Sequence, residues 1–199
     1  FSGQTIGVGY YITCEVARAM DAACGACEEA DPCQCDCPQI KGIRAEREAL
    51  SALAEDLAAG GDTSTSDIEK AHCKSAPFLY SGNTAEGIAT QVFQAFLARP
   101  PEGDELDNAR FMTFGSFVPG APSGLLFHRH GGSYDDLLDI VFESEVYRDA
   151  MVLRAFQRYL GRRPSSDELR HFSASLDQGK PDMRPLVHAL VSSSEYFQP

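Results

Sequence analysis

The residues of this 199-residue chain that are best suited to chemistry are seven cysteines, which crowd toward its N-terminus. They are Cys14, Cys24, Cys27, Cys33, Cys35, Cys37 and Cys73. The middle five follow the pattern C-x2-C-x5-C-x-C-x-C within fourteen residues. Because cytosolic thiols stay reduced unless they bind a metal, such density is typical of exported domains that disulfides hold together. We therefore expect three disulfides, with an odd cysteine available for a bond to a neighbouring chain.

Two kinds of metal site are the alternatives to disulfides. A structural zinc site would use four thiolates, but the second C-x2-C pair that such sites usually contain is missing. An iron–sulfur cluster would also need four cysteines, and the spacing here matches no familiar cluster motif. The pattern thus favours disulfides and no resident cofactor, with zinc or an iron–sulfur cluster as the alternative.

A second candidate for chemistry is the pair His128 and His130, which could bind a metal ion or an anion. No acidic residue or cysteine adjoins them, so they are only weak candidates for metal ligands. The acidic pairs Asp104-Glu105 and Asp167-Glu168 stand at expected helix starts, where a carboxylate stabilises the helix dipole by about 0.3–1 kcal/mol. They are therefore not interpreted as catalytic pairs, and we expect that the protein is not an enzyme.

The overall composition narrows the classes of partner. The net charge is −12, whereas nucleic acids and anionic membranes are bound by basic surfaces. No apolar run approaches the roughly 18 residues needed to span a bilayer. We expect protein partners, and an exported location in the periplasm, outside the cell or at its surface. The sequence opens FSGQTIG without methionine, which fits either a removed leader or a missing N-terminus.

Amphipathic helices are expected along most of the remaining chain. Ile40–Ala59 carries an apolar stripe and ends at Gly60-Gly61, which is a usual helix stop. Ser66 and Glu69 have the spacing of a capping box for the brief helix that follows. Tyr134–Tyr147 is expected to form one helix that a preceding serine caps.

The second half of the sequence contains an internal repeat. Val92–Leu106 matches Ala155–Leu169 without a gap, at an offset of 63 residues. Further on, Ser144-Glu145 falls on Ser194-Glu195 at an offset of 50, which implies a 13-residue insertion in the first copy. Each copy is expected to form three helices. Stacking the copies would bury a core that about fifty residues cannot bury alone.

A corner between the first two helices of each copy is its best-matched part. The corner residues are Arg99, Pro101, Gly161, Arg162 and Pro164. Ser165 and Glu168 follow with the spacing of a capping box. We expect the arginines to bond the last carbonyls of the preceding helix or a carboxylate such as Glu145 or Glu195. These residues are therefore interpreted as structural.

The segment 111–132, which contains the insertion, is rich in Gly, Pro and Phe, so we expect a loop that contacts a partner. The candidate contacts are Phe111, Phe114, Phe117, Leu125, Leu126 and Phe127. Tyr10 and Tyr11, in a glycine-rich N-terminal arm, are further candidates. The alternatives are that the segment folds back on the protein's own core and that the arm is a frayed terminus.

These residues together resemble a known helical module. SEVYRDAMVLRAFQRYLGRRPSSDELRHF, a glycine-containing turn and LVHALVSSSEYF are similar to the module shared by phycobilisome linker domains and the DUF4214 family. In that module a Leu-Gly-Arg-x-Pro corner follows a helix with aromatic residues, and the end reads Ser-x-Glu-Tyr/Phe. The resemblance covers about 85–197 as two tandem copies, of which the first departs through Arg99-Pro100-Pro101 and the insertion. It implies a structural role, because members of these families are mostly linkers, surface proteins and assembly subunits.

The sequence therefore predicts a mainly α fold, with two tandem three-helix modules behind a disulfide-stapled, partly helical N-terminal region. The expected boundaries are 1–77 for that region, 78–147 for the first module and 148–199 for the second. The predicted function is that of a non-enzymatic structural or scaffolding subunit of an exported protein assembly. The alternatives are a metal-binding or redox protein that uses Cys24–Cys37, and an accessory protein that binds a glycan or peptide. The latter would use Tyr134, Tyr147 and Tyr159.

Overall fold

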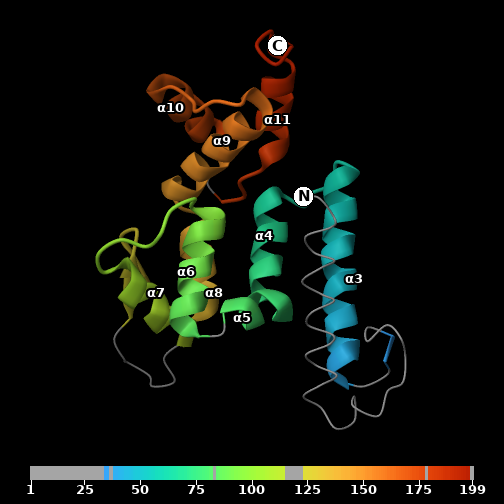
Figure 1. Ribbon diagram of the computed structural model, residues 1–199, viewed down its shortest axis with the longest axis vertical. Coiled ribbons are helices and arrows are strands. Elements are labelled where there is room, and N and C mark those ends of the chain that lie inside the picture. The colour runs from blue at the N-terminus through green and yellow to red at the C-terminus, as the bar shows by residue number, and fades with distance from the viewer. Residues whose placement is uncertain (1–33, 36–37, 83, 115–122, 178, 198–199) are drawn as a thin grey trace. The chain divides into compact units, whose positions relative to one another are not determined.

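The computed structural model of the chain describes residues 34–35, 38–82, 84–114, 123–177 and 179–197 (Figure 1). Helices dominate these residues, which confirms the mainly α fold predicted from the sequence. None of the helices in the described ranges is long and apolar enough to cross a membrane.

Contacts divide the chain into two compact units. Phe1–Thr63 and Ala71–Ser81 form the first, and Ser64–Lys70 with Gly82–Pro199 form the second. The boundaries expected at 77 and 147 both fall inside helices, namely α5 (Ala76–Gly82) and α9 (Glu145–Leu160). The structural division also assigns the first residues of α4 (Thr65–Lys74) to the second unit.

In the first unit, α3 (Pro38–Ala58) is the long helix expected at Ile40–Ala59. Its buried apolar side chains are Ile40, Ile43 and Leu50. After α3 the chain turns at Gly60, whose φ of +79° lies in the left-handed region that glycine tolerates best. The glycine stop predicted from the sequence is therefore present.

The second unit contains two successive sets of three helices. The first set is α6 (Ala85–Phe96), α7 (Glu105–Phe114) and α8 (Tyr134–Phe142). The second set is α9, α10 (Ser166–Ser175) and α11 (Met183–Val191), and in it α10 and α11 both pack on α9 (Figure 1). The single helix expected at Tyr134–Tyr147 is in fact the end-to-end pair α8 and α9, which Ser144 separates as the N-cap of α9.

A β-hairpin stands in the first set where the sequence predicted a loop. β1 (Gly124–Leu126) pairs with β2 (Arg129–Gly131) in antiparallel register. The two residues between the strands, Phe127 and His128, both have positive φ, 49° and 64°, as a type I′ turn requires. Such turns usually contain Asn or Gly, so Phe127-His128 carries no turn signature in the sequence.

Helix boundaries correct the register of the repeat. The helical ranges of α8 and α11 coincide at an offset of 49, which also places the N-cap Ser133 on the N-cap Asp182. The offset of 50 predicted from the sequence is therefore wrong by one residue, and Ser144 matches Ser193. Each of these two hydroxyls donates to the carbonyl three residues earlier at 2.7 Å and accepts from the N–H three residues later. The insertion in the first copy is thus fourteen residues long.

The corner after the first helix is built in the same way in both sets. Arg99 donates through both terminal nitrogens to Glu105, at 2.6 and 2.7 Å, and Arg162 does so to Glu168, at 2.9 and 2.7 Å. These bidentate pairs lie 63 residues apart, as the repeat predicts. Arg162 donates in addition to Glu195, at 2.7 Å through Nη2, which is one of the two carboxylates considered from the sequence.

Two further contacts of the corner recur at the same offset. The guanidinium lies over a buried phenylalanine ring, 5.5 Å from the centroid of Phe93 in the first set and 5.1 Å from that of Phe156 in the second. Its Nη1 also donates to the carbonyl of the next residue, Pro100 or Arg163, at 3.0 Å in both cases. Arginine suits this place because its planar fork stacks and makes bidentate bonds at once.

Hydrogen bonds from Arg162, followed by those from the backbone N–H and hydroxyl of Ser165, lower the pKa of Glu168 from 4.5 to about 2. The folded value lies below the unfolded one, so this carboxylate stabilises the fold above about pH 4.5. That contribution is lost as the pH falls through about 2.

Glu168→Gln should therefore lower the free energy of unfolding at pH 7 by at most about 1 kcal/mol, because the pair remains partly hydrated. The difference in free energy of unfolding between wild type and variant should shrink as the pH falls from 4.5 to 2. Urea unfolding at pH 7, 4 and 2.5 checks this, with the exposed Asp167→Asn as a matched control. A difference that grows as the pH falls would contradict the assignment.

The two corners differ at one residue that carries backbone strain. Gly161 ends α9 in the left-handed region at φ +67°, and the residue at the same place in the first set is Ala98, at φ +55°. A side chain beyond Gly costs about 1 kcal/mol in this conformation, because Cβ approaches the following carbonyl. The first corner therefore holds strain that the second avoids.

Ala98→Gly should raise the free energy of unfolding, and Gly161→Ala should lower it, each by about 1 kcal/mol. Chemical denaturation of the two variants side by side gives the measurement, since they exchange the same pair of residues at equivalent places. Equal effects of the same sign would show that the two corners are not equivalent.

A buried polar cluster joins α4 to α9 within the second unit. The hydroxyl of Tyr147 donates to Glu69 at 2.6 Å, and a guanidinium nitrogen of Arg154 lies 3.4 Å from the other oxygen of that carboxylate. Tyr147 and Glu69 are 0% and 3% exposed. Burial, and then the negative charge of Glu69, raise the pKa of Tyr147, so the phenol stays protonated and donates.

This use of Glu69 shows that the capping box expected at the start of α4 is wrong. The reciprocal cap is made two residues earlier, where Ser64 and Asp67 each accept from the other's backbone N–H, at 2.8 and 3.2 Å. Glu69 points into the interior instead, because a buried tyrosine and an arginine satisfy it there.

Candidate binding site

The cysteines lie mostly outside the part of the chain that the structure describes. Cys14, Cys24, Cys27, Cys33 and Cys37 are in this group. The other two, Cys35 and Cys73, are buried, at 1% and 0% exposure. Burial protects both side chains from solvent reagents, so both positions suit a structural role.

Some of the predicted partner contacts belong to the protein's own core. Leu126 is 1% exposed, and Phe127 packs its ring 6.2 Å from that of Phe93. Leu126 is therefore removed from the predicted contact surface, since it cannot reach a partner. Phe111 is half-buried, and Leu125 is 47% exposed. Within the described part of the segment, Leu126 and Phe127 thus fold back on the core, and Leu125 of the hairpin stays exposed.

The remaining predicted contacts are Tyr10, Tyr11 and Phe117, together with the side chain of Phe114, and all of these lie outside the described residues. Tyr147, expected in an aromatic binding surface with Tyr134 and Tyr159, is fully buried, so that surface does not form as predicted.

His128 lies in the turn of the hairpin and His130 lies on β2, and both are exposed. Nδ1 of His130 is 2.9 Å from the hydroxyl of Ser123. Within the described ranges, no group of three or more His, Cys, Asp or Glu side chains is arranged to hold a metal ion. The histidine pair thus lacks a third ligand among the residues whose placement is known.

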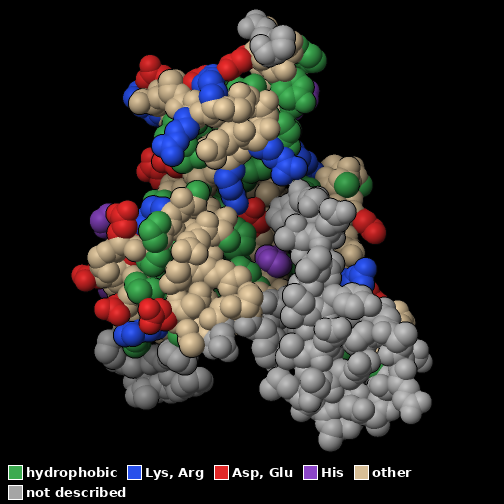
Figure 2. All heavy atoms as spheres, viewed as in Figure 1, with side chains coloured by type: hydrophobic (Ala, Val, Ile, Leu, Met, Phe, Trp, Pro, Cys, Tyr) green, Lys and Arg blue, Asp and Glu red, His purple; other side chains and the backbone are tan. Residues whose placement is uncertain are grey.

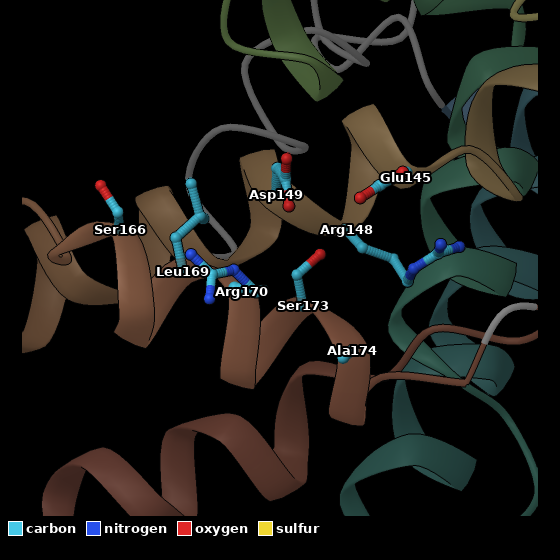
Figure 3. Close-up of a pocket in the computed structure, with 8 residues that line it drawn as sticks. All are labelled: Glu145, Arg148, Asp149, Ser166, Leu169, Arg170, Ser173 and Ala174. Carbon is cyan, nitrogen blue, oxygen red and sulfur yellow. The ribbon is translucent and has the colours of Figure 1, made fainter.

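A pocket of about 430 Å³ lies between the first half of α9 and α10 (Figure 3). From α9 it is lined by Glu145, Arg148 and Asp149. From α10 it is lined by Ser166, Leu169, Arg170, Ser173 and Ala174. Residues three and four apart share one helix face, so each helix turns a single side toward the pocket. Six polar or charged residues therefore line one hollow.

The two arginines of the pocket are already engaged, whereas its carboxylates are not. Arg148 donates to a backbone carbonyl at 3.0 Å, and Arg170 lies 3.4 Å from Asp167. Glu145 and Asp149 have no hydrogen-bond or ion-pair partner within the part of the chain that the structure describes. Like charges four residues apart on a helix repel each other. The lining thus combines two carboxylates with two arginines, so its formal charges balance.

Ser173 contributes to the pocket a hydroxyl that has no hydrogen-bond partner among the described residues. The residue is 5% exposed, and its hydroxyl makes no hydrogen bond with any residue that the structure describes. Figure 3 shows this hydroxyl directed from α10 toward α9, whereas the guanidinium of Arg148 is turned away from it. A hydroxyl in this position can bond to solvent, so it does not by itself mark a ligand site.

The lining is particular to the second copy of the repeat. At the offset of 63, Glu145 corresponds to Gly82 and Ser173 to Arg110. Moreover, α9 starts one turn earlier than α6 does, and that additional turn supplies Glu145. No local motif in the sequence marks these residues. The available signal in the sequence is that the two copies differ at these lining positions, whereas their corner residues match.

Comparison of the whole chain with protein-family models, with curated proteins and with solved structures gave no match. The case for this site therefore rests on its geometry and charge alone.

Two serines of the second unit should respond to truncation in opposite ways. Ser144→Ala should lower the free energy of unfolding by about 1 kcal/mol, because this 8%-exposed hydroxyl caps α9 and satisfies a carbonyl. Ser173→Ala should leave stability within about 0.5 kcal/mol of wild type or raise it, since no bond is lost. Urea unfolding measures both, and a large loss for Ser173→Ala would mean that its hydroxyl has a structural partner.

Proposed function

We propose that the protein is a non-enzymatic structural subunit of an exported assembly, and that it binds partner proteins through its tandem helical modules. The resemblance of the sequence to the module of phycobilisome linkers and the DUF4214 family supports the proposal, because members of these families are mostly assembly parts. The observation that carries the proposal is the difference between the ends of the two copies.

The tyrosine at the end of the first copy is buried, whereas its counterpart at the end of the second copy is exposed. Tyr147 is 0% exposed, with its ring 4.8 Å from that of Phe142 and its hydroxyl on Glu69. At the corrected offset of 49 its counterpart is Tyr196, which is 44% exposed, and the neighbouring Phe197 is 73% exposed. Adjacent exposed aromatic side chains are unfavourable in water and favour a partner surface.

The hairpin of the first copy supplies a second apolar contact. Leu125 is 47% exposed on β1, an edge strand of a two-stranded sheet. On the face that Figure 2 shows, acidic and basic side chains are interspersed over the described surface. A mixed surface with few apolar anchors is typical of specific protein contacts.

Export is part of the proposal, and the cysteines support it. Seven cysteines in one chain, two of them buried, fit a disulfide framework better than a set of reduced thiols. Intact mass measurement of the unreduced protein should show a loss of about 6 Da relative to the reduced chain, for three disulfides. Free thiols with bound zinc or iron would support the metal-binding alternative instead.

The assembly is tested by purifying the tagged chain from the organism that produces it, under native conditions, and measuring the mass of the eluted species. We expect a complex much larger than the 21.6 kDa chain. Replacing Tyr196 and Phe197 by serine should reduce the recovered complex at least tenfold, because both side chains would lie at its interface. The exposed Gln157→Ser serves as a matched control. Elution of the wild-type chain alone contradicts the proposal.

A further inference from the structure

We propose that the corner of the second helical set binds the corner of the first set in a second copy of this chain. The basic corner is the segment 158–170, which joins α9 to α10, and the acidic corner is the segment 95–107, which joins α6 to α7 (Figure 1). The inference rests on the proposed function for the existence of an assembly, and it names one partner within that assembly.

The two corners share one framework but carry opposite net charge. In both, an arginine makes a bidentate pair with the glutamate six residues later and stacks on a phenylalanine ring. The formal charge is nevertheless −3 in the acidic corner and +2 in the basic corner. Arg110 and Glu195 lie outside these segments and pair with Asp107 and Arg162, which brings the values to −2 and +1.

Every charge difference between the corners has the same direction. At the offset of 63, four aligned positions differ in charge, and the basic corner is the more positive at each of them: Ala95/Arg158, Pro100/Arg163, Glu102/Ser165 and Asp107/Arg170. All eight residues are exposed. The arginine and glutamate of the framework are the same in both corners. The second copy therefore keeps the framework and reverses the charge of its outer surface.

This complementarity is not used within the chain. Among the described residues, Arg158 and Arg163 form no salt bridge, and neither do Glu102 and Asp104. No salt bridge in the described ranges joins one corner to the other either. Surfaces of opposite charge attract each other and set the orientation in which two molecules meet. A second copy fits this requirement, because it carries the matching surface for each corner.

Apolar side chains beside the charges add contact area at both corners. Pro100 is exposed in the acidic corner. Beside the basic corner, Arg162 donates to Glu195, which is followed by Tyr196 and Phe197, at 44% and 73% exposure. Aromatic side chains together with arginine are enriched at protein interfaces. The charges thus orient the two copies, and the apolar side chains are covered by the contact.

Sedimentation velocity of the purified full-length chain, under non-reducing conditions and at physiological salt, tests the contact. At that ionic strength the overall charge of −12 is screened beyond about 8 Å, whereas charges in direct contact still attract. We expect the average mass to rise above the 21.6 kDa of one chain with a Kd on the order of 100 μM, because exposed ion pairs are individually weak. The association should reverse on dilution, which separates it from an intermolecular disulfide.

Charge reversal at either corner should prevent self-association. Arg158→Glu with Arg163→Glu makes both corners acidic, and Glu102→Lys with Asp107→Lys makes both corners basic. Each variant alone should bind itself at least about tenfold more weakly than wild type. An equimolar mixture of the two should associate again, because each variant keeps the native corner that fits the other's. Recovery in the mixture also shows that both variants are folded.

A matched control and three outcomes define what would overturn the contact. Glu48→Lys with Glu55→Lys makes the same change of charge at exposed positions of α3 and should leave the Kd within about threefold of wild type. A wild-type chain that remains a monomer up to about 1 mM overturns the contact. Association that survives both reversals overturns it too. So does a mixture of the two variants that fails to associate although circular dichroism shows both to be folded.

These measurements are independent of the test of the assembly. If the purified chain associates through its corners but the native chain is recovered alone, the corner contact stands and the proposed assembly fails. If the native chain is recovered in a complex and the purified chain stays monomeric, the corner contact fails and the assembly stands.

Discussion

The arginine–glutamate corner is the interaction on which the repeat depends. In each copy one guanidinium stacks on a buried phenylalanine and donates to the carbonyl of the next residue. The same guanidinium donates to the glutamate at the start of the following helix. A helix end leaves backbone groups unsatisfied, and the chain that follows can leave the helix in different directions. A planar, bidentate donor held over a ring removes that freedom. The angle between the first two helices is therefore fixed by side chains that are local in sequence.

The candidate site follows from this constraint, because its two walls are the helices that the second corner joins. Arg162 connects Glu168, at the start of α10, to Glu195 beyond the end of α11. This second carboxylate also ties α11 to the corner. A framework held in this way leaves the lining residues free to vary, and Glu145 and Ser173 stand where the first copy has glycine and arginine. Scaffold and site are thus carried by different residues of the same helices.

The buried cluster around Glu69 shows a different principle. A carboxylate that is 3% exposed would be costly without partners, and Tyr147 and Arg154 supply them. Two nitrogens of Arg154 are nevertheless buried with no hydrogen-bond partner among the described residues. The cluster fixes the place of α4 beside α9 specifically, since a displaced Glu69 would leave the phenol and guanidinium unpaired. This contact explains why Ser64–Lys70 belongs with the repeat rather than with the cysteine-rich unit.

What the sequence determined by itself is local: the helices, the caps at Ser133 and Ser165, and a corner that repeats at an offset of 63. These features depend on residues three to six apart, whose spacing is visible in a single chain. The tertiary structure decided what depends on distant residues. The partner of Glu69 lies 78 residues away, and the turn at Phe127-His128 adopts left-handed backbone without the usual residues. The pocket also depends on packing, because polar faces of α9 and α10 form a hollow only when the Arg162 corner holds the two helices together.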